Sequence, residues 1–202
     1  MRDFQRCVDE LIWAGHELHR LGWVPATSGN FSARLDDGDL AVTVSGAHKG
    51  RLTPRDILRA DADGRPRDQR RASAETPLHV QIYRRIPEAR AVLHPHPPAA
   101  TAWSMDAGAT IELAGYELLK AFPGVDTHET RVTIPVFDND QDTVRLAQTA
   151  DAWMTRHGIP PAYLIRGHGL YTWGSGVDAA LRHCEALESM FQVEIERRRL
   201  RA

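Results

Sequence analysis

The chain has 202 residues, which is enough for one domain with a sizeable apolar core, and we expect a single domain over residues 1–202. Hydrophobic residues make up 42% and charged residues 26% of it, and the formal net charge of −2 provides no basic field for a nucleic-acid partner. No apolar run reaches the ~20 residues of a bilayer-spanning helix, and the acidic start "MRDFQRCVDELIW" has no signal-peptide core. We therefore expect no membrane partner and a cytoplasmic location.

The first part of the chain predicts a helix, a hairpin and a second helix. Apolar residues recur at helical spacing over 4–21, the turn "TSGN" leads into a strand at "FSARL", and "DDGD" with "LAVTVS" predicts the second strand of a hairpin. In the polar loop that follows, Thr53 is expected to cap a short turn that starts at Pro54. The charged stretch 59–73 indicates a surface excursion, and Ser73 is the expected N-cap of a helix over "SAETPLHVQIYRR".

The rest of the chain alternates strands with helices. "ARAVLHPH" predicts a strand, "PAATAWSM" a helix, "IELAGYELLKAF" a strand or loop entering a short helix, and "RVTIPVF" a strand. A helix over "TVRLAQTADAWMTRHG" ends at Gly158, two short strands surround the "GHG" turn, and a last helix runs from about Val177 toward Arg199. This order favours an α/β domain, the early hairpin argues against a purely parallel sheet, and no glycine-rich nucleotide-binding motif follows a strand.

Two histidines stand at the end of the strand "ARAVLHPH". Strand side chains alternate between faces, so His94 and His96 project from one side, close enough to share a metal ion. A third candidate ligand, His168, lies between two glycines. Three neutral imidazoles suit Zn²⁺ best and leave a position open for substrate. The residues alone leave open that the pair at 94 and 96 is structural or faces solvent.

Two glutamates and three small polar loops complete the set of candidates. Glu75 begins a helix, where a carboxylate either interacts with the helix N-terminus or serves as a general base. Glu117, in "GYELLK", is either exposed to solvent or a second candidate base. The loops at 27–30, 43–46 and 73–75 offer hydroxyls and backbone N–H groups that can hold a phosphate, or they are ordinary turns and caps.

Taken in chain order, "TSGN", "TVSG", "SAET", "AVLHPH" and "LIRGHGLYTWG" resemble the class II aldolase family, which includes zinc-dependent sugar-phosphate aldolases and epimerases. Within the family, "SGAHKGRLTP", "GYELLKAF", "PVFDNDQD" and "RGHGLYTWG" are most similar to the branch that dehydrates 5-methylthioribulose 1-phosphate in methionine salvage. The resemblance covers roughly residues 4–198. It implies a three-layer α/β/α sandwich around a mainly antiparallel sheet, and a homotetramer with sites near subunit interfaces.

The same resemblance implies roles for individual residues. One Zn²⁺ per subunit is expected on His94, His96 and His168. Glu117 stands where the dehydratases keep their catalytic carboxylate, so it is the expected acid–base residue, with Glu75, the aldolase position, as the assisting base. The substrate phosphate is expected on a set of loop residues, namely Ser28, Gly29, Asn30, Ser45, Gly46, Lys49 and Ser73.

The chain departs from the family pattern at two places. Ala74 stands where the aldolases carry a second hydroxyl before the glutamate, and Lys49 is the expected replacement for that phosphate contact. The usual "HTH" of the dehydratases is "HPH" here. Because proline removes a donor from the ladder, Pro95 predicts an edge position or irregular pairing for this strand.

The expected reaction is loss of water from 5-methylthioribulose 1-phosphate, a small phosphorylated ketose, to give 2,3-diketo-5-methylthiopentyl 1-phosphate. Zinc acidifies the C3 proton as a Lewis acid, a carboxylate takes that proton, and the C4 hydroxyl leaves as water. Two alternatives stay open at this point. One is an aldolase that cleaves C3–C4 of a ketose phosphate through the same zinc enediolate, and the other is a non-catalytic scaffold without zinc.

Overall fold

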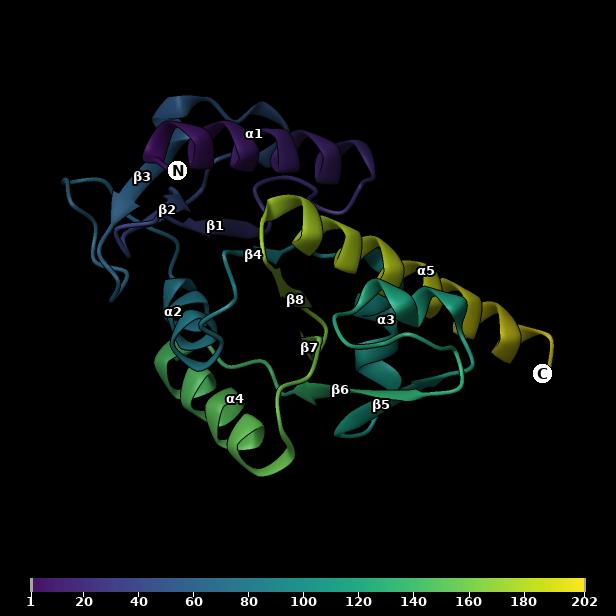
Figure 1. The fold of residues 1–202 in the computed structure, drawn as a ribbon. Helices are drawn as coiled ribbons and strands as arrows, with labels where there is room; N and C mark the ends of the chain where they lie inside the picture. The colour runs from purple at the N-terminus through teal and green to yellow at the C-terminus, as the bar shows by residue number, and fades with distance from the viewer. Residues whose placement is uncertain (1, 202) are drawn as a thin grey trace.

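An eight-stranded sheet forms the centre of the computed structural model, which describes residues 2–201 (Figure 1). The strand order is β3-β2-β1-β4-β8-β7-β6-β5, and β6 and β7 run parallel whereas the other neighbouring strands are antiparallel. The elements in chain order are α1 (Phe4–Arg20), β1 (Asn30–Arg34), β2 (Leu40–Thr43), η1 (Lys49–Arg51), η2 (Pro54–Asp56), β3 (Ile57–Ala60), α2 (Thr76–Arg85), β4 (Ala91–His94), α3 (Pro98–Asp106), β5 (Thr110–Ala114), η3 (Glu117–Ala121), β6 (Arg131–Phe137), α4 (Thr143–His157), β7 (Ala162–Ile165), β8 (Gly169–Gly174) and α5 (Val177–Arg199).

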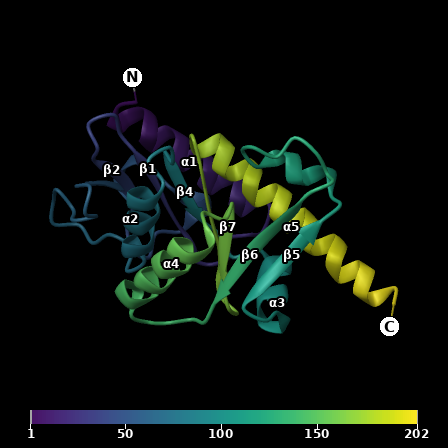
Figure 2. The ribbon, with the colours of Figure 1, turned by 60° about the horizontal axis from the view of Figure 1, so that its bottom comes forward.

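Helices cover both faces of the sheet. Helices α1, α3 and α5 lie on one face, and α2 and α4 lie on the other (Figure 2). Because strand side chains alternate, Leu93 and Leu164 pack under the first layer of helices, and their neighbours Val92 and Tyr163 pack under the second. The three-layer α/β/α sandwich with a mainly antiparallel sheet is therefore confirmed. Among the helices of residues 2–201, none is long and apolar enough to cross a membrane.

Most of the predicted elements are present, but two predictions about the segment before α2 are wrong. Residues 57–60 form the edge strand β3, which pairs with β2, where a charged surface stretch was expected from residue 59 onward. Helix α2 begins at Thr76 with Glu75 at its N-cap position, not Ser73. The Thr76 N–H donates to the Ser73 carbonyl (3.1 Å), so residues 73–76 form a separate turn that delays the start of the helix.

Strand β4 lies in the middle of the sheet, between β1 and β8, so the expectation of an edge position is wrong. The ladder ends at His94, and Pro95 follows it, where the missing N–H leaves no strand bond unmade. Beyond His94 the pairing is irregular, which is the other outcome that Pro95 predicted. Leu170 N–H donates to the Pro95 carbonyl (3.0 Å), and His96 N–H donates to the Trp23 carbonyl (2.7 Å).

A buried carboxylate fixes the start of α3, just beyond these residues. Glu188 lies in the apolar stripe of α5 and is 1% exposed. Its two oxygens accept from the first free N–H groups of α3, those of Ala99 (2.9 Å) and Ala100 (2.8 Å). A negative charge at a helix N-terminus is stabilised by the unpaired N–H groups and by the helix dipole. This contact anchors the connection that carries His96 to the long C-terminal helix.

Candidate metal centre and active site

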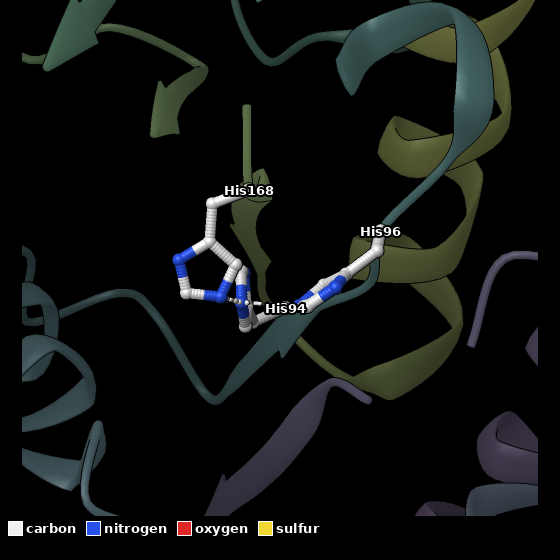
Figure 3. Close-up of side chains that lie close together, drawn as sticks. All are labelled: His94, His96 and His168. Atoms are coloured by element: carbon white, nitrogen blue, oxygen red, sulfur yellow. Dashed lines mark hydrogen bonds between the residues drawn. The ribbon is translucent and has the colours of Figure 1, made fainter. Parts of the chain in front are cut away.

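Three histidines meet at the end of the sheet where β4 and β7 finish and β8 begins (Figure 3). His94 is the last residue of β4, His96 lies in the connection to α3, and His168 lies in the turn between β7 and β8. The Nε2 atom of His94 is 3.0 Å from that of His96 and 3.3 Å from that of His168. The predicted convergence is present, although His96 lies beyond the strand and not within it.

The donor set fits a divalent metal ion. His94 Nδ1 lies 3.0 Å from the Leu170 carbonyl, and because a carbonyl only accepts, Nδ1 carries the proton and Nε2 presents a lone pair. Burial, together with the neighbouring imidazoles, lowers the pKa of His94 well below its usual value and that of His96 to about 4. These two imidazoles are therefore neutral near pH 7. Three imidazole nitrogens that converge on one point form the kind of ligand set that a metal such as zinc prefers.

The glycine at 169 makes this convergence sterically feasible. A Cβ at Gly169 would lie 2.6 Å from the Pro95 carbonyl oxygen, 2.8 Å from His96 Cδ2 and 2.9 Å from His94 Cε1. Any larger residue would therefore push both rings. On the other side of His168, Gly167 has a φ of +63°, which a glycine adopts at little cost in this tight turn. Both glycines of "GHG" are therefore explained: Gly169 by the lack of space for a side chain, and Gly167 by its positive φ.

Glu75 belongs to the histidine cluster. Its Oε2 lies 3.2 Å from His94 Nε2, and its Oε1 lies 3.6 Å from His168 Nε2. Although the residue occupies the N-cap position of α2, its carboxylate makes no capping hydrogen bond. The Tyr171 hydroxyl donates to Oε2, and the Tyr171 ring stacks on His94 with centroids 4.0 Å apart. The side chain is thus directed at the cluster instead of the helix N-terminus.

Lys49 links one predicted phosphate loop to the segment just after another. Its ammonium donates to the Thr27 and Ala47 carbonyls, both at 2.7 Å, and so ties the loop at 27–30 to the residues that follow the loop at 43–46. The residue is only 2% exposed. Burial lowers the pKa of Lys49 to about 8, with the negative charge of Glu75 partly opposing the shift.

The other predicted phosphate-site residues lie in the same three loops. Asn30 pairs with His94 in the β1–β4 ladder, and Gly29 comes within reach of the His94 carbonyl, where a Cβ would lie 2.7 Å from the oxygen. The Ser28 hydroxyl is buried and has no hydrogen-bond partner among the described residues. The remaining loop residues are Ser45, Gly46 (φ +77°) and Ser73, whose Oγ accepts from the Glu75 N–H at 3.2 Å.

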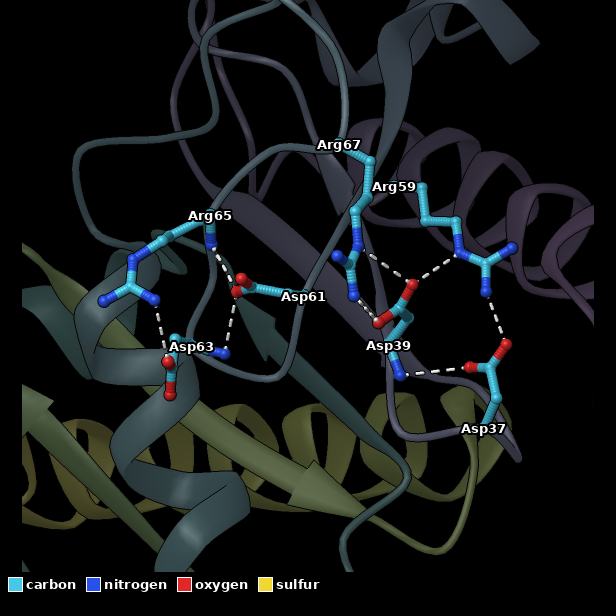
Figure 4. Close-up of polar contacts among 7 residues, drawn as sticks. All are labelled: Asp37, Asp39, Arg59, Asp61, Asp63, Arg65 and Arg67. Carbon is cyan, nitrogen blue, oxygen red and sulfur yellow. Dashed lines mark hydrogen bonds and ion pairs between the residues drawn. The ribbon is translucent and has the colours of Figure 1, made fainter.

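The charged stretch before Ser73 is held against the β1–β2 hairpin (Figure 4). The Asp39 carboxylate accepts from Arg67 (2.8 Å) and Arg59 (2.7 Å), and Arg59 also pairs with Asp37. Farther out, the Asp61 carboxylate accepts from two backbone N–H groups of its own turn, those of Asp63 and Arg65, both at 2.9 Å. Single exposed ion pairs contribute little, but this network shares its carboxylates among several donors. It fixes the path that brings Ser73 and Glu75 to the sheet.

Glu117 is not brought to the cluster by its own chain. It lies on η3, its side chain is 69% exposed, and its carboxylate pairs with Lys120 (2.7 Å) and His128 (3.1 Å). Strand β5 is antiparallel to β6, and β6 is parallel to β7, so β5 finishes at the end of the sheet opposite to the carboxyl end of β7. Because η3 follows β5, Glu117 starts from the end of the sheet opposite to the histidines.

Two residues next to the site are not among the metal, acid–base or phosphate residues predicted from the sequence. Tyr171 is fully buried, and its hydroxyl also reaches Glu75. His79 lies one helical turn beyond Glu75 on α2 and is fully buried. The available signals were spacings: Tyr171 lies two residues after Gly169 on the same face of β8, and residues 75 and 79 share a helix face.

Comparison with known proteins agrees with this geometry. Residues 9–195 match the family described as class II aldolase and adducin N-terminal domain. The chain belongs to the class II aldolase family. Two relatives within it are described as methylthioribulose-1-phosphate dehydratase. The one from Methylococcus capsulatus is 57% identical over 192 residues, covering 95% of this chain and 94% of the relative. The one from Marinobacter nauticus is 48% identical over 201 residues, covering 98% and 97%.

A solved class II aldolase shares the fold. The L-fuculose-1-phosphate aldolase from Thermus thermophilus superposes with a TM-score of 0.77 at 28% identity, over 96% of each chain. The predicted family is thereby confirmed, and the α/β/α architecture seen here is that of a class II aldolase.

Proposed function

We propose that this class II aldolase-family protein is a zinc-dependent hydro-lyase of methionine salvage. It would convert 5-methylthioribulose 1-phosphate to 2,3-diketo-5-methylthiopentyl 1-phosphate and water. The observation that carries the proposal is the cluster of three imidazoles with Glu75 directed at it, in a chain 57% identical to a methylthioribulose-1-phosphate dehydratase over nearly its whole length.

In this proposal His94, His96 and His168 hold one Zn²⁺ per subunit. A bound zinc ion supplies Lewis acidity toward the ketone and the neighbouring hydroxyl of the substrate. The imidazoles contribute as neutral ligands, and the Leu170 carbonyl keeps His94 in the tautomer that binds through Nε2.

The protein's own groups handle the phosphate and the protons. Lys49 and the loops around it bind the substrate phosphate, which places C3 of the substrate near Glu75. Glu75 lies beside two of the imidazoles and takes the C3 proton as a base. The proton that leaves with the C4 hydroxyl as water comes from an acid, and the resulting enol becomes the diketone by tautomerisation.

We assign that acid–base role at C4 to Glu117, following the dehydratase-like motif "GYELLK". Since Glu117 starts from the opposite end of its own sheet, it would reach the histidines of a neighbouring copy in a homo-oligomer, proposed as a tetramer. The exposed carboxylate on η3 is available for such a contact. The proposal also places this oligomer in the cytoplasm, with a small phosphorylated ketose as its partner and with neither nucleic acid nor membrane.

A second candidate function is aldol cleavage. The aldolase from Thermus thermophilus shares 28% identity and the whole fold, and the same carboxylate and imidazoles suit removal of a proton that initiates C3–C4 cleavage. Both reactions require the metal site and the phosphate loops, so these residues do not separate them.

Product identification separates the two reactions. Purified, zinc-loaded protein is mixed with 5-methylthioribulose 1-phosphate, L-fuculose 1-phosphate and ribulose 5-phosphate in separate reactions, and products are identified by mass spectrometry and NMR. We expect a loss of one water from the first compound and no cleavage of the other two. Cleavage of a ketose phosphate without dehydration of the first compound would favour the aldolase, and no metal uptake with no reaction would favour a scaffold.

A further inference from the structure

A chain of buried polar side chains runs from the core to the histidine cluster. Ser32 Oγ lies 2.8 Å from the Tyr83 hydroxyl and 2.7 Å from His79 Nδ1. On the other side of the ring, His79 Nε2 lies 2.5 Å from Asn30 Oδ1. These groups come from β1 and α2, and β1 pairs with β4, the strand that ends at His94 of the cluster.

The chain continues from His79 to the proposed base. The His79 ring also packs edge-on against the Tyr171 ring (5.7 Å between centroids), and the Tyr171 hydroxyl donates to Glu75 Oε2. Each side chain along the path is less than a tenth exposed, except Glu75 at its end. The path therefore begins inside the protein and ends on the carboxylate that faces the imidazoles.

The chemistry of the groups fixes the direction of the hydrogen bonds. Asn30 Oδ1 only accepts, so His79 donates from Nε2 and its Nδ1 must accept from Ser32. The Ser32 oxygen then accepts from Tyr83, so the donors from Tyr83 to His79 all point toward Asn30. The Tyr171 hydroxyl, beside the His79 ring, donates to Glu75.

Burial keeps these groups in the protonation states that this order requires. It lowers the pKa of His79 to about 4, so the ring is neutral near pH 7, although the charge of Glu75 acts in the opposite direction. Burial also raises the pKa of Tyr83 and, with a contribution from the Glu75 charge, that of Tyr171 far above the usual value. A neutral histidine has one donor and one acceptor, and here both are used.

We infer that His79 is a positioning residue of the active site: it fixes the orientation of the Asn30 amide and, through its edge-on contact with the Tyr171 ring, the position of the Glu75 carboxylate. The residue itself does not contact the imidazole cluster. It acts on two groups to which the proposed function gives roles, Asn30 in phosphate binding and Glu75 as a base, so the inference rests on that function.

A purely structural role would not explain where the path ends. An apolar core at these positions would cost less to bury than a set of polar groups that must all find partners. The network also does not close within the core, because its last donor, the Tyr171 hydroxyl, bonds to Glu75 in the histidine cluster. A preorganised base needs such support behind it.

The test compares four variants of the zinc-loaded protein. His79→Leu removes both hydrogen bonds of the ring, and His79→Gln keeps one donor and one acceptor in its place. Tyr171→Phe removes only the donor to Glu75 and keeps the ring against His94. The matched control is Tyr163→Phe, because Tyr163 stacks on Tyr171 (5.0 Å between centroids) and its buried hydroxyl has no partner among the described residues.

Steady-state kinetics with 5-methylthioribulose 1-phosphate, zinc content and thermal unfolding are measured for each variant. We expect Tyr171→Phe to lower kcat at least about 10-fold with little change in KM, since it affects the base and not the phosphate loops. His79→Leu should lower kcat and raise KM together, because it releases Asn30 as well, and His79→Gln should restore part of both. The control should match the wild type, and all four should bind zinc fully.

Unchanged kcat and KM in a folded His79→Leu protein would overturn the inference, as would equal losses in His79→Leu and His79→Gln. If His79→Leu does not fold, Tyr171→Phe and His79→Gln decide between the outcomes. A readout without substrate separates this inference from the proposed function. Nitrogen-15 NMR of histidine-labelled protein, assigned with His79→Gln, should show a neutral His79 protonated at Nε2 from pH 5 to 8, and an Nδ1-protonated or charged ring would contradict the inference.

Discussion

A buried lysine in the proposed phosphate site has a charge state that depends on its surroundings. Lys49 is 2% exposed, and its ammonium donates to two backbone carbonyls, which compensates only part of the cost of removing the charge from water. Its pKa of about 8 means that the positive charge needed for a phosphate is present at neutral pH but is lost in mildly alkaline solution. Phosphate binding should therefore depend on pH through this residue.

We predict that kcat/KM of the wild type falls as pH rises through about 8, because Lys49 loses its proton there. Lys49→Met should raise KM by about 10-fold or more at pH 7, as expected for losing a charge-assisted hydrogen bond, and should abolish this alkaline decline. Initial rates from pH 6 to 9.5 check both statements. A decline of equal size and midpoint in Lys49→Met would assign it to another group.

The same shift has a consequence for stability, whose sign follows from proton binding. The unfolded lysine keeps its proton up to about pH 10.4, whereas the folded one loses it near 8. Between these values the unfolded state binds more protons, so this residue makes the folded state more stable as pH rises. The difference in unfolding free energy between wild type and Lys49→Met should change in that direction across this window in urea titrations.

The two glutamates should separate into different kinds of defect. We expect Glu75→Gln and Glu117→Gln each to lower kcat by about 100-fold or more, as for the loss of an acid–base group, with zinc content near that of the wild type. Glu75→Gln keeps the acceptor oxygen for Tyr171, so its stability should change little. Full activity of Glu117→Gln with normal zinc content would remove Glu117 from the mechanism and leave Glu75 as the sole carboxylate.

At the scale of elements, the site depends on how closely β8 approaches the end of β4. The Leu170 N–H donates to the Pro95 carbonyl. Gly169 lies between that carbonyl and two imidazole rings, where no side chain would fit. Because Gly169 has no side chain, β8 can approach the end of β4 this closely. This approach lets the two histidines at the end of β4 meet the histidine of the β7–β8 turn. The metal site is in this sense a property of strand packing.

We predict that Gly169→Ala disrupts the metal site, because its Cβ would lie within 3 Å of Pro95, His96 and His94. Zinc per subunit, measured by mass spectrometry after dialysis, should fall well below one, and activity should fall with it. Gly108→Ala is the matched control, since a Cβ there meets no atom within 4 Å. Full zinc occupancy in Gly169→Ala would show that the rings move aside at little cost.

Periodicity predicted most elements and failed where tertiary contacts decide. The helices over 4–20 and 177–199 were evident because each has a long apolar stripe. Strand β3 was missed because four residues beside a charged stretch carry too weak a pattern, and it forms by pairing with β2. The histidines were found from spacing and from the family resemblance, whereas His79 and Tyr171 look like core residues until their hydrogen bonds are known.

At the scale of the whole molecule, a metal on this site would link segments far apart in the chain. His94 and His96 come from the central strand and the connection after it, and His168 comes more than 70 residues later. A ligand that binds only the folded state stabilises it by mass action, by about 4 kcal/mol when its free concentration is a thousand times Kd. We expect removal of zinc by a chelator to lower the Tm of the wild type and to leave that of His168→Ala unchanged, as measured by calorimetry with and without added zinc.

The topology separates Glu117 from the histidines of its own chain, so in an oligomer we expect Glu117 to complete the site of a neighbouring copy. If each site uses the three histidines and Glu75 of one copy and Glu117 of a neighbour, two inactive variants should complement each other. A mixed oligomer of His96→Ala and Glu117→Gln chains contains sites where an intact cluster faces an intact Glu117. With random assembly about a quarter of the sites are of this kind in a cyclic oligomer.

Co-expression with two different affinity tags, followed by tandem purification, yields such mixed oligomers, and their dehydratase activity is compared with that of each parent. The matched control combines His96→Ala with Glu75→Gln, because both changes fall in the cluster of a single chain and no intact site can form. We expect activity from the first mixture and none from the second. If neither mixture is active although Glu117→Gln alone is inactive, Glu117 acts within its own chain, and η3 must move toward the histidines when the substrate binds.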